Sequence, residues 1–228
     1  MRHFGSVMRN SAFAFGIGFI ALGGAMSPLG TSAVSAQTII DDWQTVKPPA
    51  APELKPVTVD LKTTALLILD FNGAQDPTKG PCNKNTKPRC LASVPKVKTM
   101  LDEARAKGVF VVYSLAGAGE PQDIATELAP LASDPIVKSG PDKFVGTNLR
   151  NILADKGIKT VIVTGTASEG AVLDTATDAA LNGMNIILPI DGMSSTELYA
   201  EQYVAWHMVN APGVSQKTTL TRIDMIKF

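Results

Sequence analysis

The sequence of 228 residues contains two histidines and two cysteines, and it has no excess of charge of either sign. His3 lies in an apolar N-terminal segment, so His207 is the one histidine left for a folded domain. A serine triad and a transition-metal site both need histidine beside other suitably placed groups, so neither kind of site is supported. Lysine and arginine together number 21, as do aspartate and glutamate. The chain therefore has no excess of positive charge of the kind that binds nucleic acid.

The N-terminal segment has the pattern of a secretory signal peptide. Arg2 and Arg9 give a basic start, residues 12–25 are apolar, and residues 34–36 are small, as a cleavage point requires. The apolar run is shorter than the roughly 20 residues that span a bilayer. We therefore predict a Sec-type signal peptide over residues 1–36 and a secreted or periplasmic mature chain that is free of the membrane after cleavage. A retained membrane anchor is the alternative.

The two cysteines, Cys82 and Cys90, lie in a polar stretch with the sequence PCNKNTKPRC. An exported chain meets an oxidising compartment, so we predict a disulfide that closes a small loop on the protein surface. A metal site would need more ligands, and this stretch has no histidine. A catalytic thiol is the other alternative, but the second cysteine would tend to form a disulfide with it and so remove the thiol.

The mature chain has the length of one domain with a real core. Residues 37–62 are proline-rich and polar, and we predict an extended N-terminal arm there rather than part of the core. The domain itself is expected over residues 63–228. No internal repeat is present.

Apolar stretches typical of buried strands alternate with helical spacing along this domain. The alternation favours a mostly parallel sheet with helices on both faces, a doubly wound α/β fold. Ser93 is expected to cap the first helix, and Ser194 with Glu197 to form a capping box before the last. The expected strands are 65–69, 109–113, 134–138, 160–163, 185–188 and one within 217–224, and the expected helices are 93–107, 146–156, 169–182 and 198–209.

Ligands of such sheets bind beyond the carboxyl ends of the strands. Asp70 follows the first strand, where partial burial would raise the pKa of its carboxyl and suit it to proton transfer. Lys138 ends a later strand and could pair with Asp70 and stabilise developing negative charge. Each residue alone also fits a plainer role, as a turn aspartate and a surface lysine.

The turn after the 160–163 strand reads GTASEG and is close to the nucleophile elbow G-x-S-x-G. Thr166 stands where that motif has glycine, two residues before Ser168. No nearby histidine in the sequence could act as the base for Ser168. His207 lies in the aromatic helix, where packing is the expected role. The segment Gly117-Ala118-Gly119 is a weak signal for a phosphate loop and is more typical of a flexible loop.

Three blocks of the sequence together resemble the isochorismatase-like superfamily, also called the cysteine hydrolases. They read TTALLILDFN, ELAPLASDPIVKSGPDKFVGTNLRNIL and GIKTVIVTGTASEGAVLDTATDAALNGMNIILPIDG. The resemblance implies a doubly wound, three-layer α/β fold and a site built from an aspartate, a lysine and a nucleophilic cysteine. It assigns the aspartate to Asp70, with Asn72 in the polar position that follows, and the lysine to Lys138, with Lys143 as second choice.

The chain departs from this pattern at Ala171, which stands where the superfamily has its nucleophilic cysteine. A methyl group cannot attack a carbonyl, so thioester chemistry is excluded at this residue. The resemblance offers another chemistry, because isochorismatases proper have glycine there and use the aspartate to protonate a vinyl ether. The metal ligands of nicotinamidases are missing, so we expect no metal and no cofactor. The superfamily's cis peptide before this turn would fall at Thr166–Ala167.

The main hypothesis is therefore an exported hydrolase that acts on a small molecule without a thiol. Asp70 would be the general acid or base with Lys138 beside it, and backbone N–H groups near Ala167 and Ala171 would hold an oxyanion. Glu169 could act as a second carboxylate, although a favourable interaction with the helix dipole explains it as well. The residues expected to touch the substrate are Asn72, Thr166, Ala167, Ser168, Glu169 and Gly170.

The alternative is a catalytically inactive relative that uses the inherited pocket to bind a small molecule or a protein partner. An open polar crevice beside Asp70 would favour catalysis, and a crevice filled by side chains would favour the alternative. A homo-oligomer is a further expectation, because the aromatic helix at 198–209 is more apolar than one buried face requires.

Overall fold

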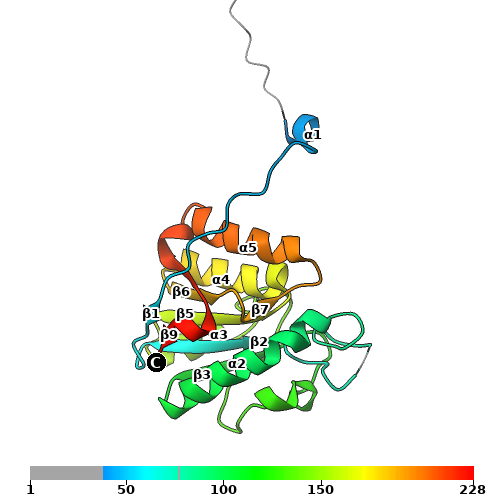
Figure 1. Cartoon of the computed structure of the whole chain (residues 1–228). Coiled ribbons are helices and arrows are strands. Elements are labelled where there is room, and N and C mark those ends of the chain that lie inside the picture. Colours follow the sequence, from blue (N-terminus) through cyan, green and yellow to red (C-terminus); the bar gives the residue numbers. More distant parts are fainter. Residues whose placement is uncertain (1–37, 77) are drawn as a thin grey trace, which may run out of the picture. The chain divides into compact units, whose positions relative to one another are not determined.

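The computed structural model describes residues 38–76 and 78–228 (Figure 1), so the predicted signal peptide lies outside the described residues. The chain divides into two compact units, of which the first ends at Lys47 and the second spans Pro48–Phe228. Within the first unit, the short helix α1 (Ile39–Asp42) has no buried residue. Among the described residues, no helix combines the length and the apolar character needed to cross a membrane.

The second unit is built on a seven-stranded sheet with the strand order β4-β3-β2-β5-β6-β8, in which β7 also pairs with β5. Every pairing in this sheet is parallel, which confirms the predicted sheet type. A two-stranded pair, β1 (Val57–Thr58) with β9 (Ile226–Lys227), completes the strands. The strands of the main sheet are β2 (Thr64–Leu69), β3 (Phe110–Leu115), β4 (Ile136–Lys138), β5 (Thr160–Thr166), β6 (Asn185–Pro189), β7 (Met193–Ser194) and β8 (Thr218–Thr221).

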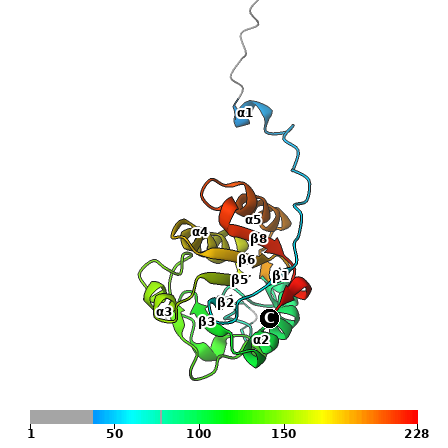
Figure 2. The same ribbon diagram turned by 90° about the vertical axis from the view of Figure 1, so that its left-hand side faces the viewer.

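Helices cover both faces of the sheet and make the three layers that the sequence predicts (Figures 1 and 2). Strand β2 is buried along its whole length because its side chains serve both cores. Leu67 and Leu69 pack in the core under α3, α4 and α5, whereas Leu66 and Ile68 pack in the core under α2. The α-helices are α2 (Pro88–Ala106), α3 (Leu149–Asp155), α4 (Leu173–Leu181) and α5 (Leu198–Asn210), and single turns lie at Pro121–Asp123, Thr126–Leu128, Ser168–Val172, Ser215–Lys217 and Ile223–Met225.

Two helix starts differ from the prediction. Helix α2 begins at Pro88, a residue well suited to the first turn, and Ser93 lies inside the helix with its hydroxyl donating to the Cys90 carbonyl at 2.8 Å. Ser194 belongs to β7, so it does not cap α5, whose N-cap position is Glu197. The Cys90 half of the cystine thus lies in the first turn of α2, and Ser194 pairs with Thr166 of β5 before α5 begins.

The predicted N-terminal arm is partly wrong, because its second half belongs to the domain. The backbone N–H of Lys55 donates to the Leu220 carbonyl at 2.9 Å, and that of Val59 donates to the Lys227 carbonyl at 3.0 Å. Val59 is buried in the core under α2, with Val57 and Leu61 packed against it. The segment 55–61 therefore pairs with the C-terminal strands and packs on the core, so the domain starts before residue 63.

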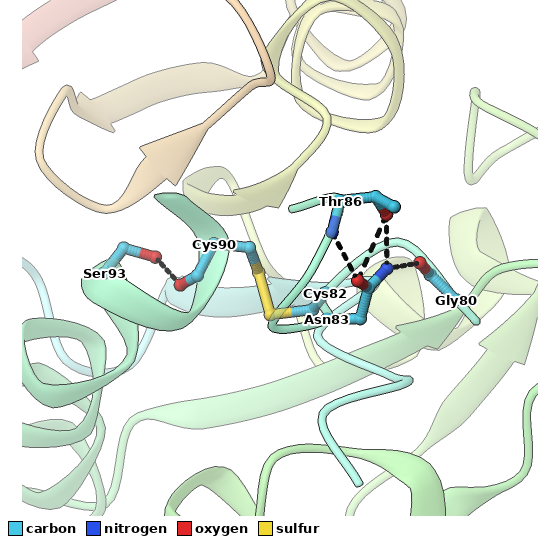
Figure 3. Close-up of a disulfide and its surroundings, with 6 residues drawn as sticks. All are labelled: Gly80, Cys82, Asn83, Thr86, Cys90 and Ser93. Carbon is cyan, nitrogen blue, oxygen red and sulfur yellow. Dashed lines mark hydrogen bonds between the residues drawn. A yellow bond between two sulfur atoms is a disulfide. The ribbon is translucent and has the colours of Figure 1, made fainter. Parts of the chain in front are cut away.

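The predicted disulfide joins Cys82 to Cys90 (Figure 3). Both cysteines are almost completely buried, at 0% and 1% exposure, so the bond belongs to the core under α2 and not to a surface loop as predicted. The Cys82 N–H also donates to the Asn72 carbonyl at 3.1 Å. The bond thus connects helix α2 with the segment that follows β2.

Gly165 allows β5 to pass close to the end of β2. Its φ is +143°, and a Cβ atom there would lie 2.3 Å from the carbonyl oxygen of Leu69. This approach brings the residues after Leu69 beside those after Gly165. The turn that starts at Thr166 is therefore placed next to Asp70.

Replacing Gly165 by alanine is expected to destabilise the domain by roughly 1–3 kcal/mol from overpacking, in addition to a backbone strain of about 1–3 kcal/mol for a φ that residues with a side chain rarely adopt. Gly157→Ala is the matched control, since Gly157 has a φ of +66° and nothing lies within 4 Å of its added Cβ. Urea denaturation of both variants checks the difference. Equal losses of unfolding free energy in the two variants would show that the backbone moves away from Leu69 without an energetic penalty.

Candidate active site

Asp70 lies just after β2 and its carboxyl group is fixed on both oxygens. The residue is 3% exposed and has a positive φ of 58°, a conformation that aspartate tolerates better than most residues. Its Oδ1 accepts a hydrogen bond from Ser114 Oγ at 2.6 Å, and its Oδ2 lies 2.7 Å from Lys143 Nζ. The carboxyl group thus sits between a hydroxyl from β3 and a buried cation.

Lys143 is fully buried, at 0% exposure. Its ammonium group donates to Asp70 Oδ2 and to the Gly140 carbonyl, both at 2.7 Å. Its backbone N–H donates to Thr175 Oγ1 in α4 at 3.1 Å. The lysine is therefore held in place by its own loop, by α4 and by the carboxyl group it neutralises.

The predicted pairing of Lys138 with Asp70 is wrong. The Lys138 side chain is 47% exposed, and its Nζ bonds Glu120 Oε1 at 2.6 Å. The strand ends at Lys138 with its side chain away from the core, and the chain then turns through Gly140-Pro141 before it returns to the site. Lys143, the second choice in the sequence, is the lysine that reaches Asp70.

Burial raises the pKa of the Asp70 carboxyl above its ordinary value. Charge attraction from Lys143 and the hydrogen bonds from Lys143 and Ser114 act in the opposite direction on this pKa, but each is smaller than the burial effect. The carboxyl group consequently keeps its proton to a higher pH than an exposed aspartate does. A raised pKa makes the carboxyl group a better proton donor to a substrate than an exposed aspartate is.

The turn after β5 has the expected cis peptide at Thr166–Ala167. A π-helical turn over Ser168–Val172 follows and leads into α4. Ala171 is 3% exposed, while Glu169 is exposed on the outside of this turn. Gly170 N–H donates to the Ala167 carbonyl at 3.1 Å.

Ser168 is fully buried, and its hydroxyl has no hydrogen-bond partner in the part of the chain that the structure describes. A serine nucleophile needs a base within hydrogen-bond reach. His207 lies on α5, where its Nδ1 is 3.4 Å from the hydroxyl of Tyr203. Nothing in this arrangement activates Ser168.

Asn72 fixes the neighbouring loop rather than pointing a free amide at a ligand. Its Nδ2 donates to the Ala116 carbonyl and its Oδ1 accepts from the Ala116 N–H, both at 3.2 Å. Gly119 closes onto this amide, because a Cβ there would lie 2.3 Å from Asn72 Nδ2. A hollow of about 550 Å³ opens on the outer side of these residues, between the loops that follow β2 and β3.

The structure therefore brings Asp70, Lys143 and Ser114 into direct contact and sets the turn at Thr166 beside them. Sequence reasoning missed Ser114, although its signal is a single hydroxyl near the end of the apolar strand FVVYSL. Both cysteines of the sequence are joined to each other, so neither offers a thiol. Across residues 38–76 and 78–228, no group of three or more histidine, cysteine, aspartate or glutamate side chains could hold a metal ion.

Comparison with known proteins gives a family match and several related chains. The family model described as the isochorismatase domain matches residues 64–219. A secreted isochorismatase effector of Verticillium dahliae is 26% identical over 154 residues, which are 63% of this chain and 78% of that protein. A streptothricin hydrolase of Streptomyces noursei is 30% identical over 129 residues, which are 52% of this chain and 47% of that protein.

Solved structures share the fold at low sequence identity. An isochorismatase family protein from Desulfovibrio vulgaris superposes with a TM-score of 0.62 at 20% identity and covers 72% of this chain and 95% of its own. A cysteine hydrolase from Pseudomonas syringae gives a TM-score of 0.63 at 17% identity and covers 76% and 95%. These matches support the α/β fold described above.

Proposed function

This chain belongs to the isochorismatase family of hydrolases, and from that membership we propose that it is an exported enzyme that hydrolyses a small molecule without a thiol nucleophile. In this proposal Ala171 takes the place that the nucleophilic cysteine holds in the thiol-dependent members. The match to a secreted effector supports export, as does the buried disulfide, which is typical of oxidising compartments.

The observation that carries the proposal is the buried contact of Asp70 with Lys143 and Ser114. Asp70 in its acid form gives a proton to the atom of the substrate that accepts it, and the bond to the leaving group weakens. Water then adds to the substrate carbon and returns one proton to Asp70, and the adduct breaks its bond to the leaving group, which departs with the second proton of the water. Lys143 Nζ, 2.7 Å from Asp70 Oδ2, stabilises the Asp70 carboxylate between the two transfers.

A second candidate function is a non-catalytic relative that binds a small molecule or a partner. The burial of the pair favours it, because the side chains of Lys143 and Asp70 are 0% and 5% exposed. A substrate reaches them only if the covering loops move. Binding of a compound without product formation would support this second function.

The direct test is a screen of the purified mature protein against amides, esters and vinyl ethers. The first proposal expects hydrolysis of one class, with loss of that activity in Asp70→Asn. Asp174→Asn is the matched control, since Asp174 is a carboxyl on the adjoining helix α4. Activity that survives in Asp70→Asn at the wild-type level would overturn the assignment of Asp70.

Ser114→Ala is expected to raise the pKa of Asp70 further, because the hydrogen bond from Ser114 is one of the contacts that lower it. For an acid-dependent reaction, the high-pH limb of the pH–activity profile would then move to higher pH. A carboxyl ¹³C titration measures the same change without a substrate. Ser93→Ala removes another buried hydroxyl, which bonds Cys90 in α2, and should leave the Asp70 titration unchanged.

A further inference from the structure

A second hollow, of about 380 Å³, lies apart from Asp70 and Lys143, between α2, β7, α5 and the loop after β6. Three cationic side chains reach it from separate segments, Arg89 and Lys96 from α2 and Arg222 from the loop after β8. Two carboxylates, Asp191 and Glu201, line the same hollow. The hydrogen bonds already made by these groups decide which kind of ligand the hollow can accept.

The carboxylate oxygens of the hollow are already occupied. Glu201 Oε1 accepts from Arg89 Nε and from the Ser195 N–H, both at 2.9 Å, and its Oε2 accepts from Arg89 Nη2 at 2.6 Å. Asp191 Oδ1 accepts from the Ile223 N–H at 2.9 Å, and its Oδ2 accepts from Lys96 Nζ at 3.3 Å. The acidic groups therefore have little capacity for a cationic ligand.

The donors of the hollow are not used up. Arg89 uses Nε and Nη2 on Glu201, and Arg222 uses Nε and Nη2 on Asp224, at 3.0 and 2.9 Å. In the described residues, Nη1 of each arginine has no hydrogen-bond partner, and Lys96 Nζ has the single partner Asp191. The side chain of Arg89 is 39% exposed, that of Lys96 is 61% exposed and that of Arg222 is 51% exposed. A dissolved ligand can therefore reach all three.

Ser194 adds an independent observation. It lines the hollow, it is 2% exposed, and its hydroxyl has no hydrogen-bond partner within the described parts of the chain. A buried hydroxyl without a partner is unfavourable, and a bound ligand removes that penalty. Ser194 also pairs with Thr166 in the β5–β7 ladder, so the hollow adjoins the strand that leads into the Thr166 turn.

We propose that this hollow is a binding site for a small oxyanion, a phosphate or carboxylate group, held by Arg89, Lys96 and Arg222 together with the Ser194 hydroxyl. Guanidinium groups present paired N–H donors that match the oxygens of both anions. Each of the three cations is paired with one carboxylate, and Arg222 has Asp224 outside the lining, so the anion binds through the unused N–H donors and not through a net positive charge. The site does not depend on the proposed hydrolysis, so failure of one leaves the other standing.

The test is calorimetric titration of the full mature protein with inorganic phosphate, and separately with acetate, in chloride buffer of constant ionic strength. Lys96→Met and Arg222→Met are each expected to weaken binding roughly tenfold, the effect of one lost charge-assisted hydrogen bond. Ser194→Ala should weaken binding while the protein stays folded. Binding of phosphate alone would identify a phosphate-bearing ligand, and binding of acetate a carboxylate.

Two matched variants control for net charge. Lys98→Met removes a cation two residues from Lys96 on α2, where Lys98 pairs with Asp102, and Arg150→Met removes an arginine that pairs with Asp178. Both should bind the anion as the wild type does. Equal weakening in the matched variants, or no binding of either anion to the wild type, would overturn the proposed site.

Discussion

Lys143→Met should destabilise the folded domain by about 3–5 kcal/mol at pH 7, because it leaves the buried Asp70 carboxyl without its cation. Lys138→Met should change the free energy of unfolding by less than about 1 kcal/mol, since the Lys138–Glu120 pair is about half exposed. Urea denaturation of both variants measures the difference. Equal losses for the two lysines would contradict the distinction between a buried and an exposed pair.

The loss in Lys143→Met should also depend on pH in a defined direction. Without the cation, the pKa of Asp70 rises further above its ordinary value of 3.8, so the folded variant binds this proton more tightly than the unfolded chain does. That contribution to stability is fully present below pH 3.8 and is lost as the pH rises through the folded-state pKa. The variant should therefore lie closest to the wild type in acid and fall furthest behind at neutral pH.

Asp70→Asn should lower kcat/KM by about 10²- to 10⁴-fold for whichever substrate the screen identifies, the range for removal of a general acid or base. Asparagine keeps the shape of the side chain and still offers an oxygen to Lys143 Nζ, but it leaves that buried cation without its counter-charge, so the variant is also expected to lose stability. The measurement is steady-state kinetics of the variant, with circular dichroism to establish that it is folded. A variant that is folded and fully active would exclude proton transfer by Asp70.

A double variant separates a chemical effect of Asp70→Asn from a structural one. Asp70→Asn combined with Lys143→Met carries no buried charge at this site, so it should regain stability relative to Lys143→Met alone. Its activity should remain low, because the proton donor is still absent. Recovery of activity together with stability would indicate that Asp70 acts only through the fold.

The sheet could be predicted from the sequence because its strands are apolar throughout, as in ALLIL before Asp70, and such runs signal burial on both faces. Asp70 was found for the same reason, as the first charged residue after a buried strand. The choice between Lys138 and Lys143 could not be made from spacing. It depends on the path of the chain through Gly140-Pro141, which only the packing against α4 determines.

Local motifs were less reliable where tertiary packing competes with them. Ser93 and Ser194 both have the sequence of helix caps, but one lies within α2 and the other pairs with β5. The contact of Ser114 with Asp70 depends on the alignment of β3 beside β2 and could not be read from either strand alone. The cystine was predicted from composition and compartment, while its burial depends on how α2 packs.

Strand β2 comes first in the chain among the strands of the main sheet, yet it lies at the centre, between β3 and β5. Asp70, which directly follows β2, pairs with Lys143, which lies 73 residues further along the chain. A fragment that ends before Lys143 has neither β5 to complete the pairing of β2 nor the charge that makes burial of Asp70 tolerable. The second half of the chain therefore completes the sheet and the site together, and truncated forms of this domain should lose both in one step.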